Sequence, residues 1–252
     1  MDVKTRWVDL PSETGHMAMF VAEPVEQATY PGLVHFHVLP GANEQHQAMA
    51  MRLAAEGYVV ALPDLYNRIS YRTSFALPDE REQAYAARKS LTFYGLAADS
   101  RTALNFLREH DNVDPSRLGV VGYCMGGTVA YLAAAFHSDV RAAAVLYGPD
   151  LVTPELSPGM PISPLELADR ITCPMLWLSA AGDPLVPPAE AEVIRAKMAS
   201  LGKSFESHIY DDPDVGHAFF DEDVPRFYNA DAADWGWPIK LDFLRRTLQD
   251  VA

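Results

Sequence analysis

The sequence predicts an α/β fold built on a mostly parallel sheet with helices on both faces. Short apolar runs alternate along the chain with longer stretches whose apolar residues recur at helical spacing. Strands that alternate with helices form right-handed crossovers, which bring the strands together in parallel. With 49 % hydrophobic and 21 % charged residues, a chain of 252 residues has enough apolar surface for one large core. We therefore expect a single domain over residues 1–252.

The chain opens with two segments that read as an antiparallel hairpin at one edge of this sheet. Residues 4–10 and 16–23 are the expected strands, and a polar turn at 12–15 joins them. The first parallel unit follows as a buried strand at 33–39, a tight loop at 40–43, a helix at 44–56 and a strand at 58–62.

The rest of the chain continues the alternation. Further strands are expected at 117–123, 142–148, 174–180 and 204–210, and helices near 79–90, 95–110, 188–201 and 225–248. Another helix should follow the strand 117–123 directly. The one change of composition is the segment 151–170, which holds four prolines. This segment reads either as a lid or rim loop or as a plain surface connection.

Charge and cysteine content argue against several classes of protein. The formal net charge is −14, and an acidic surface repels phosphate backbones and anionic lipids, so we expect no nucleic-acid or membrane partner. The two cysteines, Cys124 and Cys173, form no metal-ligand pattern, and the chain begins without an apolar signal segment. A cytoplasmic, reducing compartment with free thiols is the simplest interpretation.

Residues 120–135, VVGYCMGGTVAYLAAA, place a cysteine between an apolar strand and an apolar helix. The run from Gly122 through Cys124 to Gly126 fits the pattern G-x-nucleophile-x-G, in which a sharp turn strains the backbone of the nucleophile. Glycines are needed there because a β-carbon would strike a neighbouring strand or helix. The sulfur should then lie over the positive end of the following helix, where a thiolate is favoured. The alternative is a buried, inert cysteine.

Two later loops supply partners in the order acid, then histidine. Asp183 follows the strand 174–180 in a loop opened by Gly182, and His217 lies between the strand 204–210 and the last helix. The carboxyl ends of parallel strands share one edge, so Cys124, Asp183 and His217 can meet there. Asp183 also fits a turn or helix-cap role, and a single histidine is more often a surface or core residue.

These three side chains predict nucleophilic catalysis through an acyl-cysteine. His217 takes the thiol proton, Asp183 holds the imidazole in the required tautomer, and the thiolate attacks an acyl carbon. The backbone N–H of Met125 should be one oxyanion donor. Leu39 should supply the second, because the neighbouring Pro40 has no N–H. Water activated by His217 then hydrolyses the acyl-enzyme.

With these residues in place, the chain resembles the dienelactone hydrolase family of α/β-hydrolases. The resemblance implies the α/β-hydrolase fold, a Cys–His–Asp triad, no cofactor, and hydrolysis of small enol-lactones or esters. An arginine of this family helps to bind the substrate carboxylate, and the resemblance gives that role to Arg81; the alternative is a solvated surface charge, which is the commoner role of an arginine at the start of a polar helix. The matching segments occur in the family's order and are EGYVVALPDLYNR (56–68), REQAY (81–85), VGYCMGG (121–127), GDPLVP (182–187) and GHAFF (216–220).

The chain departs from family members that cleave dienelactone at three positions. Val38 stands where those enzymes have a glutamate that pairs with the arginine and takes the thiol proton. Ala218 and Asp221 stand where they have a serine and an arginine. These departures argue against dienelactone as the physiological substrate. They leave the triad intact, with the thiol dependent on His217 alone for activation.

Several aromatic and imidazole side chains are candidates for contact with the substrate. His37 adjoins the oxyanion loop, and Tyr85 and Tyr123 offer aromatic walls, although core packing is the commoner role of a single tyrosine. His35, His37 and His46 have poor spacing for metal binding, and we predict no metal site.

The sequence therefore predicts a hydrolase of a small ester or lactone. One alternative is a thioesterase or acyltransferase that uses the same triad. Another is a non-catalytic ligand-binding protein on this fold, against which the complete triad argues, because a binding pocket has no need of all three groups. Neither the natural substrate nor the oligomeric state is predicted.

Overall fold

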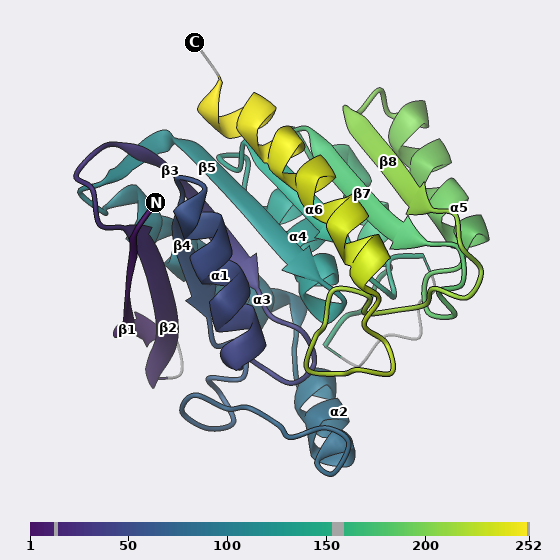
Figure 1. Cartoon of the computed structure of the whole chain (residues 1–252), viewed down its shortest axis with the longest axis horizontal. Helices are drawn as coiled ribbons and strands as arrows, with labels where there is room; N and C mark the ends of the chain where they lie inside the picture. The colour runs from purple at the N-terminus through teal and green to yellow at the C-terminus, as the bar shows by residue number, and fades with distance from the viewer. Residues whose placement is uncertain (13–14, 153–158, 251–252) are drawn as a thin grey trace.

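The computed structural model describes residues 1–12, 15–152 and 159–250, and the strands within these ranges form one eight-stranded sheet (Figure 1). The spatial order of the strands is β1-β2-β4-β3-β5-β6-β7-β8. Their bounds are β1 Val3–Ser12, β2 Gly15–Pro24, β3 Tyr30–Phe36, β4 Val59–Pro63, β5 Val113–Tyr123, β6 Ala142–Leu146, β7 Met175–Ala180 and β8 Phe205–Tyr210.

The direction of the strands agrees with the α/β-hydrolase fold expected from the sequence. Strand β2 pairs antiparallel with both β1 and β4, whereas every pair from β4 through β3 to β8 is parallel. The predicted hairpin thus forms one edge of the sheet. All the loops that follow β3 to β8 consequently leave from the same carboxyl edge.

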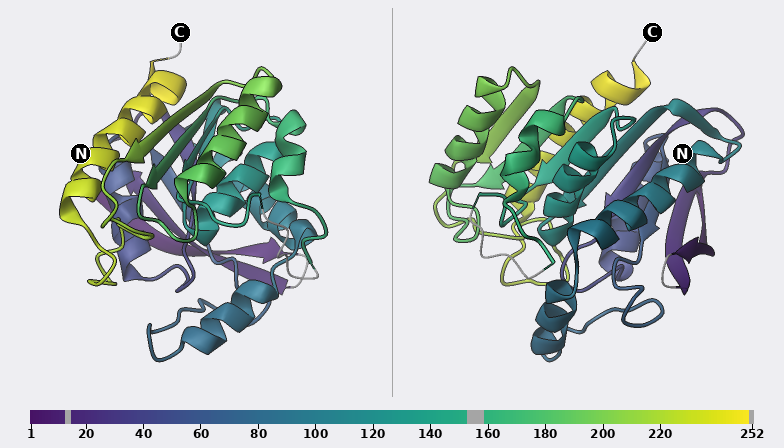
Figure 2. Two further views of the ribbon diagram at one scale, coloured as in Figure 1. Left: turned by 90° about the vertical axis from the view of Figure 1, so that its right-hand side faces the viewer. Right: turned by 180° about the vertical axis from the view of Figure 1, so that it is seen from behind.

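Helices cover both faces of the sheet (Figures 1 and 2). Helices α1 and α6 lie on one face, and α3, α4 and α5 lie on the other. Strand β5 alternates accordingly, because Val120 packs toward α4 and Val121 packs toward α6. The bounds of the helices are α1 Glu44–Ala55, α2 Arg81–Lys89, α3 Phe93–Arg108, α4 Met125–Phe136, α5 Pro188–Ser200 and α6 Ala230–Leu244.

One predicted strand differs from the observed one in a way that matters for the site. Strand β3 begins at Tyr30 and ends at Phe36, whereas the sequence indicated 33–39. A β-carbon on Gly126 would lie 2.2 Å from the Phe36 carbonyl oxygen, so the first turn of α4 occupies the space into which β3 would have continued. Residues 37–40 therefore form a loop at the carboxyl edge.

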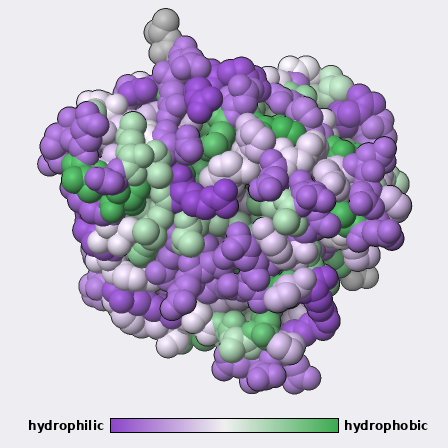
Figure 3. Space-filling model, viewed as in Figure 1, coloured by the Kyte–Doolittle hydropathy of each residue, from purple (hydrophilic) through white to green (hydrophobic). Residues whose placement is uncertain are grey.

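The proline-rich segment 151–170 is only partly covered, because residues 153–158 lie outside the described residues. Pro164–Arg170 forms a short 3-10 helix that packs against α4 and α5. None of the described helices has the length and apolar character needed to cross a bilayer. The face shown in Figure 3 is largely hydrophilic, with small, scattered apolar patches.

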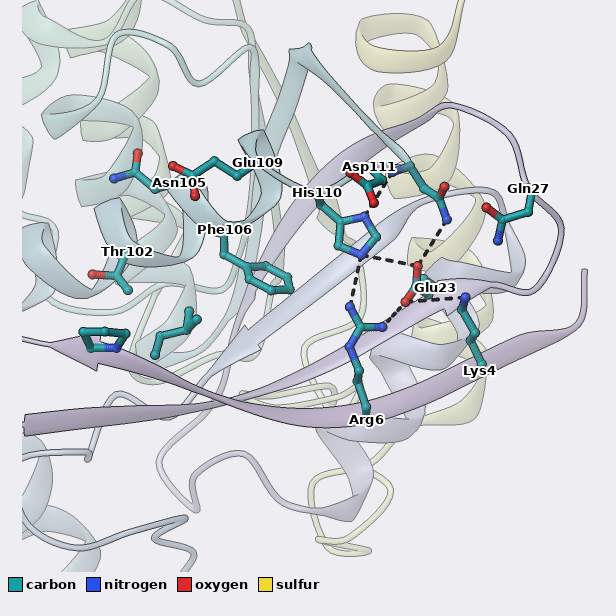
Figure 4. A pocket seen from close by; sticks show the side chains of 13 residues that line it. Lys4, Arg6, Glu23, Gln27, Thr102, Asn105, Phe106, Glu109, His110 and Asp111 are labelled. Atoms are coloured by element: carbon teal, nitrogen blue, oxygen red, sulfur yellow. Dashed lines mark hydrogen bonds and ion pairs between the residues drawn. The ribbon is translucent and has the colours of Figure 1, made fainter.

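A buried carboxylate fastens the edge hairpin to the end of α3 (Figure 4). Glu23 on β2 is 2 % exposed and pairs with Arg6 of β1, while its second oxygen lies 3.4 Å from His110 Nε2. Asn112 donates to that same oxygen over 3.5 Å. The cluster forms part of the wall of an open groove of about 790 Å³ between the hairpin and α3. This groove contains none of the residues predicted to be catalytic.

We expect Glu23→Gln to destabilise the fold by about 1–3 kcal/mol, because it removes the buried charge that Arg6 neutralises. The half-exposed position of Arg6 keeps the cost below that of a fully buried pair. Urea unfolding should show the loss, whereas the exposed neighbour Glu26→Gln should change stability by less than about 0.5 kcal/mol. Equal urea concentrations at the unfolding midpoint of Glu23→Gln and Glu26→Gln would contradict a structural role for the Glu23 carboxylate.

Candidate active site

Cys124 occupies the turn between β5 and α4 and has a strained backbone. Its φ of 50° and ψ of −126° lie in a region that side-chain-bearing residues rarely adopt. Cys124 is partly exposed, lies at the carboxyl edge and is the N-cap residue of α4. The predicted strand–turn–helix context of this cysteine is confirmed.

Close packing of backbone around the turn maintains this conformation. A β-carbon on Gly122 would lie 1.9 Å from the Gly126 carbonyl oxygen, and one on Gly127 would lie 2.8 Å from the Leu146 carbonyl oxygen. No real side chain fits at such distances. Helix α4 therefore begins in contact with β3 and β6, as its glycines predicted.

Asp183 lies just beyond β7 and is 2 % exposed. Its Oδ1 accepts hydrogen bonds from the backbone N–H groups of Leu185 and Val186, at 2.8 and 3.1 Å. These bonds fix the rotamer of the carboxylate and leave Oδ2 free for another donor. Oδ1 of Asp183 thus stabilises the turn, and Oδ2 is available to the site.

His217 lies in the loop between β8 and α6, and its Nδ1 is 2.8 Å from Asp183 Oδ2. The other ring nitrogen, Nε2, is buried and has no hydrogen-bond partner among the described residues, and the nearby Cys124 acts on the ring electrostatically. Burial lowers the pKa of His217, but the charge of Cys124 and the bond to Asp183 together raise it to about 10. The structure thus brings the three predicted side chains together.

The two predicted oxyanion donors lie on either side of this turn. Met125 contributes the first amide of α4, and Leu39 lies in the loop after β3; within the described residues, neither N–H donates to a protein acceptor. Tyr66, which the sequence gave no reason to select, joins them. Its hydroxyl donates to the Leu39 carbonyl oxygen over 2.9 Å and lies 3.4 Å from Met125 Sδ.

Two of the side chains predicted to contact substrate are fully buried. His37 Nδ1 donates to the Val38 carbonyl oxygen over 2.7 Å, and its Nε2 accepts from the Leu65 N–H over 3.1 Å. Tyr123 has no exposed surface, and its hydroxyl bonds to Lys240 over 2.5 Å. Neither side chain presents a free polar atom, so both support the walls of the site from within the core.

The other two candidates lie on α2, which projects from the carboxyl edge (Figure 1). Arg81 is exposed, with its guanidinium carbon 5.5 Å from the centre of the Tyr85 ring. Farther along the same helix, Arg88 forms an ion pair with Asp150. Arg88 and Cys124 both act electrostatically on Tyr66, so Arg88 is a cation of the site region that the sequence did not reveal.

Among the residues that the structure describes, no three His, Cys, Asp or Glu side chains are arranged to hold a metal ion. His35 and His46 are bonded to each other over 3.0 Å and belong to a buried cluster with Asp221.

Comparison with known proteins agrees with the geometry. Residues 17–248 match the model of the dienelactone hydrolase family. A provisionally assigned carboxymethylenebutenolidase of Synechocystis sp. is 27 % identical over 239 residues, which cover 94 % of each protein. A provisionally assigned 2-oxo-3-(5-oxofuran-2-ylidene)propanoate lactonase of Bradyrhizobium sp. is 29 % identical over 241 residues, covering 95 % of this chain and 93 % of the relative.

Solved structures show the same fold. A provisionally assigned dienelactone hydrolase of Klebsiella pneumoniae superposes with a TM-score of 0.85 at 24 % identity, over 98 % of this chain and all of that one. A dienelactone hydrolase-like promiscuous phosphotriesterase from metagenomic libraries gives 0.80 at 19 % identity, over 97 % of this chain and 98 % of that one.

The raised pKa of His217 yields a direct test. Cys124→Ser removes the sulfur charge that favours the imidazolium, so the pKa of His217 should fall by about 1–3 units. Titration of the histidine ring resonances by NMR measures the change. His110, which lies beside the hairpin, should titrate identically in both proteins, and an unmoved His217 would show that the two side chains do not interact.

Proposed function

Because the chain belongs to the dienelactone hydrolase family, which hydrolyses esters and lactones, we propose that it cleaves a small ester or lactone through Cys124, His217 and Asp183. The observation that carries the proposal is the 2.8 Å bond between His217 Nδ1 and Asp183 Oδ2 beside the strained turn of Cys124. A fixed imidazole adjoining a thiol at a helix N-terminus is the arrangement that nucleophilic catalysis needs.

The reaction begins from the pair of thiolate and imidazolium that forms when the Cys124 proton passes to His217, and the same pair is restored at its end. The sulfur attacks the acyl carbon, and the negative charge on the carbonyl oxygen is stabilised by the N–H groups of Met125 and Leu39. The tetrahedral species then collapses as His217 returns the proton to the leaving oxygen, which leaves an acyl-cysteine. Water gives a proton to His217 and attacks the acyl carbon, and departure of the thiolate releases the carboxylic acid.

Activation of the thiol relies on His217 in this proposal. Val38 is 3 % exposed and apolar, so the loop after β3 offers no carboxylate at that position. Ala218 and Asp221 likewise supply no cation after the histidine. Of the predicted cationic contacts with a substrate carboxylate, Arg81 remains, with Tyr85 beside it on α2. We therefore infer a small acyl substrate for which Arg81 is the accessory carboxylate contact.

Replacement of the nucleophile tests the proposal most directly. Cys124→Ala should lower kcat/KM for a chromogenic aryl acetate by at least ~10³-fold and abolish the burst of product that precedes steady turnover. The matched variant Cys173→Ala, which removes the other thiol, should keep both. Undiminished turnover in Cys124→Ala would rule out the acyl-cysteine. Diversion of the acyl group to an added alcohol or amine would identify the enzyme as an acyltransferase.

The role of Arg81 is tested by comparing substrates that differ in charge. Arg81→Ala should raise KM about 3–10-fold for a lactone that bears a carboxylate, because a charge-assisted hydrogen bond is lost, and should leave a neutral aryl ester unaffected. Lys89→Ala, a charge removal farther along the same exposed helix, serves as the control. Equal effects on both substrates would remove Arg81 from the binding site.

A further inference from the structure

A cluster of buried polar side chains lies beside the loop that carries His217. His35 comes from β3, His46 from α1 and Asp221 from the loop itself, and they are 0 %, 0 % and 7 % exposed. None of the three side chains takes part in the reaction proposed for Cys124, His217 and Asp183. Buried polar groups are costly unless they are paired, so the cluster requires a physical explanation.

The three side chains lie in a row, in which one contact is a hydrogen bond and the other is slightly too long to be one. His35 Nε2 lies 3.0 Å from His46 Nδ1, which is a hydrogen bond. At the other side of the same ring, His46 Nε2 lies 3.8 Å from Asp221 Oδ1. Both of these atoms are buried without another hydrogen-bond partner in the described part of the chain. The two atoms thus lie just beyond hydrogen-bond distance of each other, and the Tyr147 hydroxyl is another buried, unpartnered polar group on which Asp221 acts.

Further contacts join the His217 loop to the start of α1. Asn43 donates to Asp223 over 2.9 Å, and Gln45 donates to the Phe220 carbonyl oxygen over 3.3 Å. The Asp221 N–H also bonds to the Ala218 carbonyl oxygen over 2.9 Å, which folds the loop back on itself. The loop that carries His217 is thus fastened to the same helix that follows the oxyanion loop at Leu39.

We propose that His46 and Asp221 form a positioning pair for His217, in which the ionised Asp221 accepts a hydrogen bond from His46 and favours the protonated imidazole of His217. This inference rests on the proposed role of His217. The bond from the Asp221 N–H to the Ala218 carbonyl oxygen holds Asp221 in the same turn as His217, whose charge lowers the pKa of Asp221 against the larger raising effect of burial. By reciprocity, the Asp221 carboxylate stabilises the His217 imidazolium.

Protonation of Asp221 reverses the direction of the hydrogen bonds. When Asp221 is ionised, His35 donates from Nε2 to His46, and His46 donates from Nε2 to the carboxylate. When Asp221 takes up one proton, its O–H donates to His46 Nε2, and the His46 proton then lies on Nδ1, facing His35. One proton enters and both rings change tautomer, so neither imidazole becomes charged.

Burial supports the neutral state of both rings and the titration of the acid. It lowers the pKa of His46 to about 3 and that of His35 well below its usual range, and it raises the pKa of Asp221 to about 7. The titratable and charged groups around Asp221 are His217 and Asp223 on its loop, His46 on α1, His35 on β3, Tyr123 on β5, Tyr147 after β6, and Lys240 on α6 beside the two histidines.

The first test is the pH profile of kcat/KM for an aryl acetate. In Asp221→Asn the His217 imidazolium loses a favourable charge, so the alkaline limb should move to lower pH by about 0.5–1 unit. Glu222→Gln removes an exposed charge from the adjacent position and should leave the limb in place. Titration of Cys124 with iodoacetamide gives the fraction of active enzyme in each variant, and the measured rates are corrected by that fraction. If the alkaline limb of Asp221→Asn lies at the same pH as that of the wild-type enzyme, the proposal is overturned. Loss of folded enzyme alone lowers the height of the pH profile and does not move its limbs.

The second test needs no Asp221 variant and no activity. Long-range ¹H–¹⁵N NMR of the wild-type protein should show His46 passing from the Nδ1–H to the Nε2–H tautomer between pH 6 and 8.5, with the signal assigned by its loss in His46→Gln. A single His46 tautomer over that range would overturn the pair. This readout is separate from the proposed function, which fails instead if Cys124→Ala still turns over substrate.

Discussion

The close contact of backbone at the start of α4 is the constraint on which the site depends. Gly126 lies so near the end of β3 that a β-carbon would be 2.2 Å from the Phe36 carbonyl oxygen, and Cys124 is held at a φ of 50°. This packing stops β3 at Phe36 and opens the loop that contains Leu39. It also places the first amide of α4 beside the sulfur. The position of the candidate nucleophile and of both candidate oxyanion donors therefore results from one steric arrangement.

The parallel sheet accounts for the rest of the site. Strands β7 and β8 are neighbours and point the same way, so the loops that follow them carry Asp183 and His217 to one edge. Two backbone N–H groups hold one oxygen of Asp183, and the other oxygen bonds to His217. Because the carboxylate of Asp183 is fixed by these backbone bonds, the imidazole bonded to its other oxygen is held in one orientation.

Buried polar side chains next to the carboxyl edge belong to the core and also support the candidate site. His37 and Tyr123 are fully buried, and their polar atoms bond to the backbone and to Lys240. They shape the carboxyl edge from inside the sheet. The pair formed by His46 and Asp221 extends this support to the loop of His217. Asp221 stands where the family resemblance implies an arginine, and in this structure its carboxylate is buried beside His46.

The sequence by itself determined the order of strands and helices, the hairpin edge, the turn at Cys124 and the loops of Asp183 and His217, because hydrophobic period, glycine spacing and chain order are local properties. It did not determine where β3 ends, that His37 is enclosed, that Tyr66 joins Leu39 to Met125, or that His46 faces Asp221. Those outcomes depend on which distant segments pack together. Only the tertiary structure decides which polar atoms lose water and which partners they gain.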